Sequence, residues 1–350
     1  MKIFIFMRYL NNFGAAKMFM WVAEHLAMEG HDVTIYTFSY VRDVTIPENV
    51  HYIHDDLDKK GMIGKIHQIR RRIKEADADV AISFLLDSNV YNIFACKGLR
   101  TKSVICERND PFKPKYYKLR FWYPFFRMAD GAVFQLEKVA DFYKNIKHNT
   151  AVIPNPVIVK NGVELKPFDK RLKTIVTLGR IDIFQKRTDI LVKAFKIFHE
   201  YHPEYRLVIY GEGPDEGEII EQIKELGLQD FIDLAGNTLI PQQSIKDARM
   251  FVISSDFEGI PNALIEGMVI GLPCISTDCR PGGAALLIEN GKNGLLCPRG
   301  NTEELAKCMI WIADHPEEAD KMGEEAKRIS DHFSEEKISK MWAEYVNTLK

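Results

Sequence analysis

Two successive series of short apolar segments, separated by amphipathic stretches, constrain the fold of this 350-residue chain more than any other feature. Buried parallel strands are almost continuously apolar, and helices join them in sequence. The pattern therefore predicts an α/β protein with two parallel sheets, each covered by helices such as the one expected over Ala15 to Glu29. The expected strands lie at 3–7, 33–37, 80–85, 103–107 and 131–135, and at 174–179, 206–211, 231–236, 250–255 and 273–278.

The segment between the two series, "VIPNPVIVKNGVELKPFDKR", has two prolines around Asn155 and little helical period. A chain of this length also exceeds the size at which one core usually keeps growing. We therefore expect two Rossmann-like domains, at 1–165 and 166–334, followed by a last helix at 335–350. Ligands of such sheets bind at the carboxyl ends of the strands, so a cleft between the two domains is the expected site.

Charge and composition narrow the class of protein. Residues 1–165 carry 24 Lys and Arg against 18 Asp and Glu, whereas residues 166–350 carry 23 against 31. The basic half suggests contact with anions such as phosphate or a membrane surface, although two ordinary solvated surfaces are equally compatible with these numbers. The six cysteines have no metal-ligand spacing, and the apolar run in "MKIFIFMRYL" is too short for a signal peptide. We expect a cytoplasmic enzyme that does not bind nucleic acid.

Two cations follow the first strand of the second series. The stretch "TLGRIDIFQKRTDIL" places Gly179 and Arg180 directly after the strand and Lys186 near the start of the next helix. Cations beside the free amides of a helix N-terminus favour a diphosphate ligand. A pair of solvated loop cations is the alternative interpretation.

The stretch "FEGIPNALIEGM" places two carboxylates where a later strand meets its helix. Glu258 is expected in the loop, Gly259 and Pro261 in the turn, and Glu266 about one turn into a helix that starts near Asn262. Carboxylates there suit hydroxyl-rich ligands such as a ribose or hexose. Alternatively, Glu266 only interacts favourably with the helix dipole.

The spacing of Glu258 and Glu266 resembles the Glu-x7-Glu motif of retaining, nucleotide-sugar-dependent glycosyltransferases of the family-4 group, which have the GT-B double-Rossmann fold. Arg180 and Lys186 fall where that family has its diphosphate-binding Arg and Lys. The resemblance extends over nearly the whole chain, through "GEGP", "GLPCISTD" and "IENGKNGLLCP". It implies an acceptor-binding N-terminal domain, a donor-binding C-terminal domain and a C-terminal helix that packs back on the N-terminal domain.

The resemblance also implies a role for each site residue. Arg180, Lys186 and Glu258 would be the catalytic residues, because they would stabilise the leaving diphosphate and hold the donor sugar, while Glu266 would hold the ribose. Transfer would retain the anomeric configuration, with the departing phosphate taking the acceptor proton, so no separate base is required. The expected donor-binding set is Gly14, Gly179, Arg180, Lys186, Glu258, Gly259, Ile260, Pro261, Asn262, Ala263, Leu264 and Glu266.

Two positions depart from the family pattern. The loop "NNFGAAK" resembles the family's GGA-type loop, but Phe13 replaces the first glycine and only Gly14 remains. In "CERNDPFKP", Arg108 stands where many relatives have a histidine near the reacting centre. An arginine is a poor base, but it can stabilise a phosphate, so Arg108 and Asn109 are assigned to the acceptor side.

The stretch "KPKYYKLRFWYPFFRMAD" interleaves basic and aromatic residues, and a second basic run, "KIHQIRRRIK", lies in the same half. Such mixtures suit the headgroup region of an anionic membrane, although an ordinary helix is nearly as good an interpretation. We hypothesise a glycan acceptor linked to a lipid diphosphate, used in cell-surface polysaccharide or glycoconjugate synthesis. The enzyme would then lie at the inner face of the membrane, as a peripheral protein.

Other classes of protein have weaker support. The strings at 56–58 and 77–79 have the DxD form that binds metal in other glycosyltransferases, but structural roles are favoured, so we expect neither a metal nor another cofactor. In "YGEGPDEG" the third glycine is one residue late for a nicotinamide-binding loop. A sugar-nucleotide epimerase of GT-B type and an inactive nucleotide-sugar-binding subunit remain the alternatives to a hexosyltransferase that uses a UDP-sugar.

Overall fold

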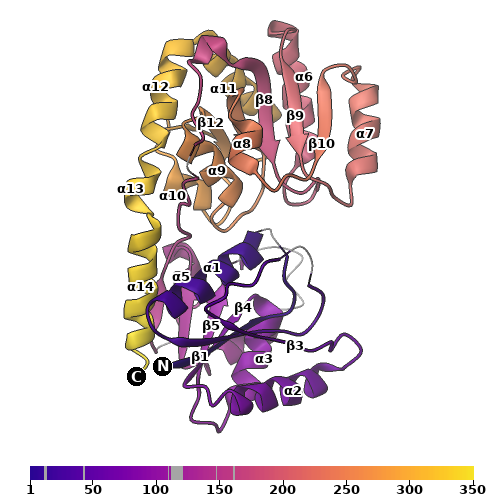
Figure 1. Cartoon of the computed structure of the whole chain (residues 1–350). Coiled ribbons are helices and arrows are strands. Elements are labelled where there is room, and N and C mark those ends of the chain that lie inside the picture. The colour runs from indigo at the N-terminus through magenta and orange to yellow at the C-terminus, as the bar shows by residue number, and fades with distance from the viewer. Residues whose placement is uncertain (12–13, 42–43, 109, 112–120, 147, 161) are drawn as a thin grey trace. The chain divides into compact units, whose positions relative to one another are not determined.

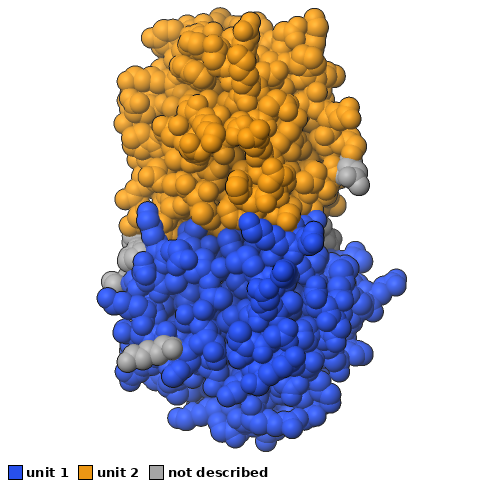
Figure 2. All heavy atoms as spheres, turned by 90° about the vertical axis from the view of Figure 1, so that its left-hand side faces the viewer, with its two compact units in different colours: residues 1–155, 335–350 blue, residues 156–334 orange. Residues whose placement is uncertain are grey.

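The structure, a computed structural model, describes residues 1–11, 14–41, 44–108, 110–111, 121–146, 148–160 and 162–350. The chain forms two compact units: unit 1 comprises residues 1–155 and 335–350, and unit 2 comprises residues 156–334 (Figure 2). The boundary thus lies before the expected one at 165 and 166. The reason is that Val157 pairs with Ser334, and the backbone of Ile158 and Lys160 hydrogen-bonds to the Gln242 side chain, which ties this segment to unit 2.

Unit 1 contains a seven-stranded sheet in the order β3-β2-β1-β4-β5-β6-β7. The sheet is parallel, as the apolar segments predict, but β3 and β7 were not among the expected strands (Figure 1). Every residue of β1 after Lys2 is buried, because β1 pairs with strands on both sides. The strand at His51 has mostly exposed side chains and therefore gave no apolar signal in the sequence. The strands are β1 (Lys2–Met7), β2 (Asp32–Thr37), β3 (His51–His54), β4 (Val80–Phe84), β5 (Lys102–Glu107), β6 (Gly131–Phe134) and β7 (Thr150–Val152).

The helices of unit 1 cover this sheet and bury an aromatic-rich core. Phe4, Phe6, Tyr36 and Phe38 pack with apolar residues of α2 and α3, which pack against each other. Stacked and tilted aromatic rings in this core fix side-chain positions beyond what area burial alone provides. The helices are α1 (Gly14–Met28), α2 (Met62–Glu75), α3 (Leu86–Cys96), α4 (Tyr123–Phe126), α5 (Glu137–Phe142) and α14 (Glu335–Asn347).

The C-terminal helix α14 packs on unit 1, which confirms the expectation that it returns to the N-terminal domain. Trp342 is 1% exposed and its ring lies 6.4 Å from that of Phe84. The Tyr345 hydroxyl donates a hydrogen bond to the carbonyl of Asn149 (2.8 Å). These two large anchors make α14 part of the core of unit 1.

Unit 2 contains a six-stranded parallel sheet in the order β10-β9-β8-β11-β12-β13. Its core includes Phe195, Phe198, Met250 and Met309, and α6 and α11 pack together on the sheet (Figure 1). The strands are β8 (Leu172–Leu178), β9 (Arg206–Tyr210), β10 (Ile232–Gly236), β11 (Ala248–Ile253), β12 (Cys274–Thr277) and β13 (Leu295–Cys297). The helices are η2 (Phe168–Lys170), α6 (Thr188–Tyr201), α7 (Glu216–Glu225), α8 (Pro241–Ile245), α9 (Asn262–Ile270), α10 (Gly283–Leu287), α11 (Thr302–Asp314), α12 (Pro316–Ala326) and α13 (Ile329–His332).

No helix within the described residues is both long enough and apolar enough to span a membrane.

Candidate functional site

The candidate site of unit 2 lies where β8 and β11 end. These strands are neighbours in a parallel sheet, so the loops that follow Leu178 and Ile253 emerge at the same edge. One loop carries Arg180 and Lys186, and the other carries Glu258. A small pocket at this edge is lined by Gly179, Arg180, Lys186, Ser254 and Ser255, together with residues of α6 and of the strands below.

Asp182 organises the first loop. Its carboxylate accepts hydrogen bonds from the backbone N–H groups of Phe184 (2.9 Å) and Gln185 (2.5 Å), and from Arg180 Nη2 (2.5 Å). Burial alone would raise the pKa of Asp182, but the Gln185 N–H and the Arg180 guanidinium outweigh it, and the pKa is lowered. The loop is therefore built around an ionised carboxylate that holds Arg180, whose side chain stays 56% exposed.

Lys186 and Glu258 are brought together directly. Lys186 Nζ lies 2.5 Å from Glu258 Oε1, and both side chains are largely buried, at 23% and 12% exposed. The Ser255 hydroxyl donates to the same carboxylate oxygen (3.1 Å). The two residues, assigned separately to phosphate and sugar from the sequence, thus form one hydrogen-bonded ion pair.

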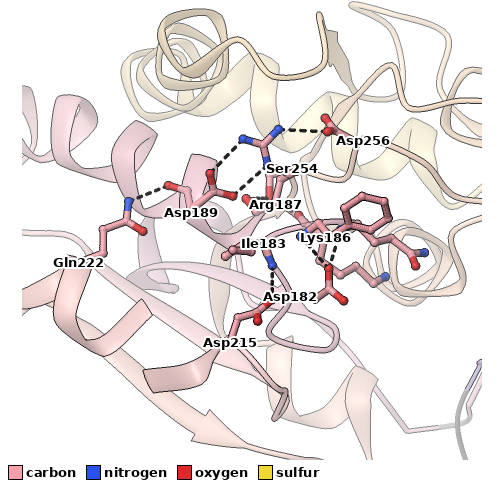
Figure 3. A network of polar contacts seen from close by, with 11 residues as sticks. Asp182, Ile183, Lys186, Arg187, Asp189, Asp215, Gln222, Ser254 and Asp256 are labelled. Atoms are coloured by element: carbon pink, nitrogen blue, oxygen red, sulfur yellow. Dashed lines mark hydrogen bonds and ion pairs between the residues drawn. The ribbon is translucent and has the colours of Figure 1, made fainter. Parts of the chain in front are cut away.

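Arg187 was missed in the sequence, although it fixes the two loops to each other (Figure 3). Its guanidinium binds Asp189 through two N–H groups (3.0 and 2.9 Å) and Asp256 through a third (3.0 Å). These carboxylates raise its pKa, and the residue itself adopts a left-handed backbone conformation (φ 53°) where α6 begins. Nothing in "QKRTD" distinguished this structural arginine from Lys186 beside it.

The turn between Glu258 and α9 depends on close backbone approach. The backbone N–H of Glu258 donates to the carbonyl of Arg280 (2.7 Å), and a Cβ on Gly283 would lie 1.6 Å from the carbonyl oxygen of Gly259. Only a glycine at position 283 therefore allows the backbone of Gly259 to approach this closely. Helix α9 starts at Asn262 after Pro261, as expected from the sequence.

One residue of the expected donor-binding set is already engaged. The backbone N–H of Leu264 donates to the carbonyl of Pro261 (3.0 Å), and its side chain is fully buried. This hydrogen bond closes the first turn of the helix, and the assignment of Leu264 to the donor site stays a prediction.

Glu266 is held by a residue that the sequence did not reveal. Gln242 of α8 is 1% exposed, and its Nε2 donates to Glu266 Oε2 (2.7 Å) and to the carbonyl of Ile158 (2.8 Å). Its Oε1 accepts a hydrogen bond from the N–H of Lys160 (3.2 Å). Gln242 thus fixes Glu266 relative to the segment that enters unit 2, and only a three-dimensional contact could identify it.

The assigned residues Gly14 and Arg108 belong to unit 1. Gly14 opens α1 with a left-handed conformation (φ 52°), and a Cβ built on it would meet nothing within 4 Å. Arg108 follows β5 and is 9% exposed. Phe13 and Asn109 lie outside the described residues.

The DxD strings have protein partners. Asp77 pairs with Lys2 and Arg100, and Asp79 accepts a hydrogen bond from the backbone of Lys2. Asp58 accepts from Ser39 and Arg8. The described part of the chain shows no group of three or more His, Cys, Asp or Glu residues that could hold a metal ion.

The fold and this site define a class of protein: two Rossmann-like units with cations and carboxylates at the end of the second sheet are typical of GT-B glycosyltransferases. The family model described as "Glycosyl transferases group 1" matches residues 164–329, and "Glycosyltransferase Family 4" matches residues 14–161. The chain therefore belongs to the family-4, group 1 glycosyltransferases.

Individual relatives agree with this assignment. An uncharacterised glycosyltransferase of Methanocaldococcus jannaschii is 28% identical over 69% of this chain and 64% of its own length. A second, from Haemophilus influenzae, is 29% identical over 54% of this chain and 52% of its own length. The match thus spans less than two thirds of these two relatives.

One relative matches from end to end. The undecaprenol-diphosphate-glycan α-1,4-N-acetyl-D-galactosaminyltransferase of Campylobacter jejuni is 25% identical over 100% of this chain and 99% of its own length. Among solved structures, HepE of Anabaena in complex with UDP and glucose superimposes with a TM-score of 0.82 at 18% identity, over 99% of this chain and 100% of HepE. The sucrose-phosphate synthase of Thermosynechococcus elongatus has a TM-score of 0.84 at 16% identity, over 99% of this chain and 98% of that protein. Both structures establish the GT-B fold.

Proposed function

We propose that the protein is a retaining glycosyltransferase that moves a hexosyl or N-acetylhexosaminyl unit from a UDP-sugar to a glycan acceptor linked to a lipid diphosphate. The observation that carries this proposal is the buried Lys186–Glu258 ion pair at the strand ends of unit 2, beside Arg180. The Campylobacter relative, by its name, acts on an undecaprenol-diphosphate glycan. The product would serve the synthesis of a cell-surface polysaccharide or glycoconjugate.

Lys186 can serve the donor diphosphate while it remains paired with Glu258. An ammonium group has three N–H donors, and the contact with Glu258 uses one of them. The other two can meet a phosphate oxygen as negative charge grows on the leaving group, and the exposed Arg180 supplies a second cation. The pairing positions the ammonium in advance, which reduces the reorganisation that the reaction requires.

The two glutamates would bind different parts of the donor. Glu258 has a second carboxylate oxygen that can accept a hydrogen bond from a sugar hydroxyl. Glu266, oriented by Gln242, would accept hydrogen bonds from the ribose hydroxyls. The donor phosphate oxygen would take the acceptor proton, so neither glutamate acts as a base. We expect no metal and no other cofactor in this reaction.

A donor screen tests this function. UDP- and GDP-sugars would be incubated with lipid-linked acceptors and the products identified by mass spectrometry. Transfer from a UDP-sugar with retained anomeric configuration is expected. A change of the sugar in UDP-sugar alone, without acceptor, would instead identify an epimerase, and binding without any reaction would identify an inactive subunit.

Contact with the membrane is a separate part of the proposal. Much of the basic and aromatic stretch lies outside the described residues, but Phe121 is 68% exposed. We expect peripheral association with the cytoplasmic face of an anionic membrane. Liposome flotation with and without anionic lipid checks it, and failure to float in both cases would contradict it.

A further inference from the structure

The strongest unexplained feature outside the donor site is a buried cation at the end of the sheet of unit 1. Arg108 is 9% exposed and directly follows β5. Its guanidinium lies 4.8 Å from the centre of the fully buried Phe84 ring, at the end of the neighbouring strand β4. Removing an arginine from water is costly unless another group compensates its charge.

The partners of Arg108 are neutral. Its Nη1 donates to Asn155 Oδ1 (2.5 Å), and Gln135 Nε2 donates to the same oxygen (2.5 Å). Asn155 and Gln135 are themselves buried, at 2% and 5% exposed. Among the described residues, no Asp or Glu side chain forms an ion pair with Arg108, and burial lowers its pKa to about 10, which still leaves it charged at neutral pH.

The acid next to Arg108 in the sequence bonds to its backbone: Glu107 Oε1 accepts a hydrogen bond from the Arg108 N–H (3.0 Å). Burial, and after it the charges of Glu107, Tyr123 and Asp110, raise the pKa of Tyr143. The guanidinium faces Phe84 and Asn155 instead.

This cluster stands at the carboxyl ends of four neighbouring strands, β4, β5, β6 and β7, which is the edge where parallel sheets bind ligands. We propose that Arg108, oriented by Asn155 and Gln135, is an anion subsite that binds a phosphate or diphosphate group of the acceptor. The phosphate assignment rests on the proposed lipid-diphosphate acceptor. The bound anion would compensate the charge of Arg108, which the neutral side-chain amides of Asn155 and Gln135 cannot do. The remaining N–H groups of the guanidinium match phosphate oxygens.

The test uses the full chain and inorganic pyrophosphate as the probe, with affinity measured by calorimetry. Wild type, Arg108→Gln, Arg180→Gln and the double variant are compared, because Arg180 belongs to the donor site of unit 2. Arg108→Gln is expected to weaken pyrophosphate binding at least tenfold in both backgrounds. Equal affinity with and without Arg108 in both backgrounds would overturn the proposal.

Arg70→Gln is the matched control, since Arg70 is also an arginine of unit 1 bonded to neutral acceptors, the carbonyls of Ala95 and Lys97. It is expected to leave pyrophosphate binding within twofold of wild type. Geranyl diphosphate, titrated in parallel, distinguishes a lipid diphosphate from free phosphate: tighter binding than pyrophosphate identifies the lipid form. For either probe, the affinity must fall with Arg108→Gln.

Asn155→Asp is a second variant that tests the same subsite if the Arg108→Gln protein does not fold. This isosteric change gives Arg108 a carboxylate at the same position, so the thermal midpoint should rise while pyrophosphate binding falls at least tenfold. Unchanged binding in Asn155→Asp would contradict the proposal. Because these measurements need no sugar transfer, they stand apart from the donor screen: either can fail while the other succeeds.

Discussion

The strand ends of the two units hold their cations in opposite ways. In unit 2, Lys186 pairs with Glu258 and Arg187 with Asp189 and Asp256, so each buried cation has a carboxylate partner. In unit 1, Arg108 is bonded to the amide oxygen of Asn155. Both clusters occupy the edge where a parallel sheet binds ligands, but only the first is neutralised by carboxylates among the described residues.

The difference indicates two ways to prepare a binding site for phosphate. A carboxylate partner fixes a cation in place and leaves its unused N–H groups for the ligand, at the expense of part of its attraction for an anion. An amide partner fixes the cation without reducing its charge. We therefore expect the loops of unit 2 to depend on their ion pairs for order, and the site of unit 1 to depend on its ligand for charge compensation.

The largest expected effect is that of Lys186→Ala. Loss of the ammonium removes the cation proposed to bind the donor diphosphate and leaves Glu258 as an unpaired carboxylate beside it. UDP affinity measured by calorimetry should fall about 100-fold, or about 2.7 kcal/mol. Lys173→Ala is the control, because Lys173 is an exposed lysine of unit 2 paired with Glu204, and it should have no effect. Unchanged UDP binding in Lys186→Ala would show that the site is wrongly assigned.

Arg187→Ala tests whether the ion pairs of unit 2 order its loops. The change leaves the largely buried Asp189 and Asp256 without their shared partner. The free energy of unfolding of unit 2, from urea titration, should fall by about 2 kcal/mol. Arg206→Ala, which removes an exposed ion pair with Asp233, should lower the free energy of unfolding by under about 1 kcal/mol. Equal losses in the two variants would mean that burial of the pair is unimportant.

Gln242→Ala isolates the orientation of Glu266. The variant removes the buried amide that donates to Glu266 Oε2 but keeps the carboxylate itself. UDP affinity should fall about tenfold, about 1.4 kcal/mol, and less than in Glu266→Ala. Gln243→Ala changes the neighbouring exposed glutamine of α8 and should leave UDP affinity unchanged. If Gln242→Ala binds UDP as wild type does, Glu266 needs no positioning partner.

The sequence predicts the sheets well because their strands are continuous apolar runs, and it predicts the start of α9 at Asn262 from the Gly-x-Pro turn before it. Edge strand β3 is exposed, so its residues carry no such signal. The boundary between the units was misplaced for a similar reason: the contacts of Ile158 and Lys160 with Gln242 join segments far apart in the chain.

Within the candidate site, local motifs predicted Arg180, Lys186, Glu258 and Glu266, because each stands next to a strand end or helix start. The residues that position them could not be predicted. Arg187 and Gln242 act through contacts across the fold, and their neighbours Lys186 and Gln243 are chemically similar. The ion pair between Lys186 and Glu258 likewise depends on two loops whose adjacency only the sheet order establishes.

The smallest expected effect concerns the ion pair between Arg72 and Asp55 in unit 1. This pair has a structural role, so unit 1 also uses a carboxylate to hold a structural cation. Asp55 accepts two hydrogen bonds from Arg72 (2.7 and 2.9 Å), and this contact, with further bonds from Gln68 and Tyr36, lowers its pKa. A lowered pKa in the folded state stabilises the protein above the unfolded-state pKa, near 4, and this contribution is lost as pH falls below it.

Asp55→Asn should therefore reduce the free energy of unfolding by about 1 kcal/mol at pH 7 and by less at pH 3. Asp247→Asn, in an exposed pair with Lys166, should cost under about 0.5 kcal/mol at pH 7. An Asp55→Asn difference that stays constant from pH 7 to pH 3 would show that the carboxylate is not the source of the stability. Unit 1 would then rely on neutral partners for Arg72 as it does for Arg108.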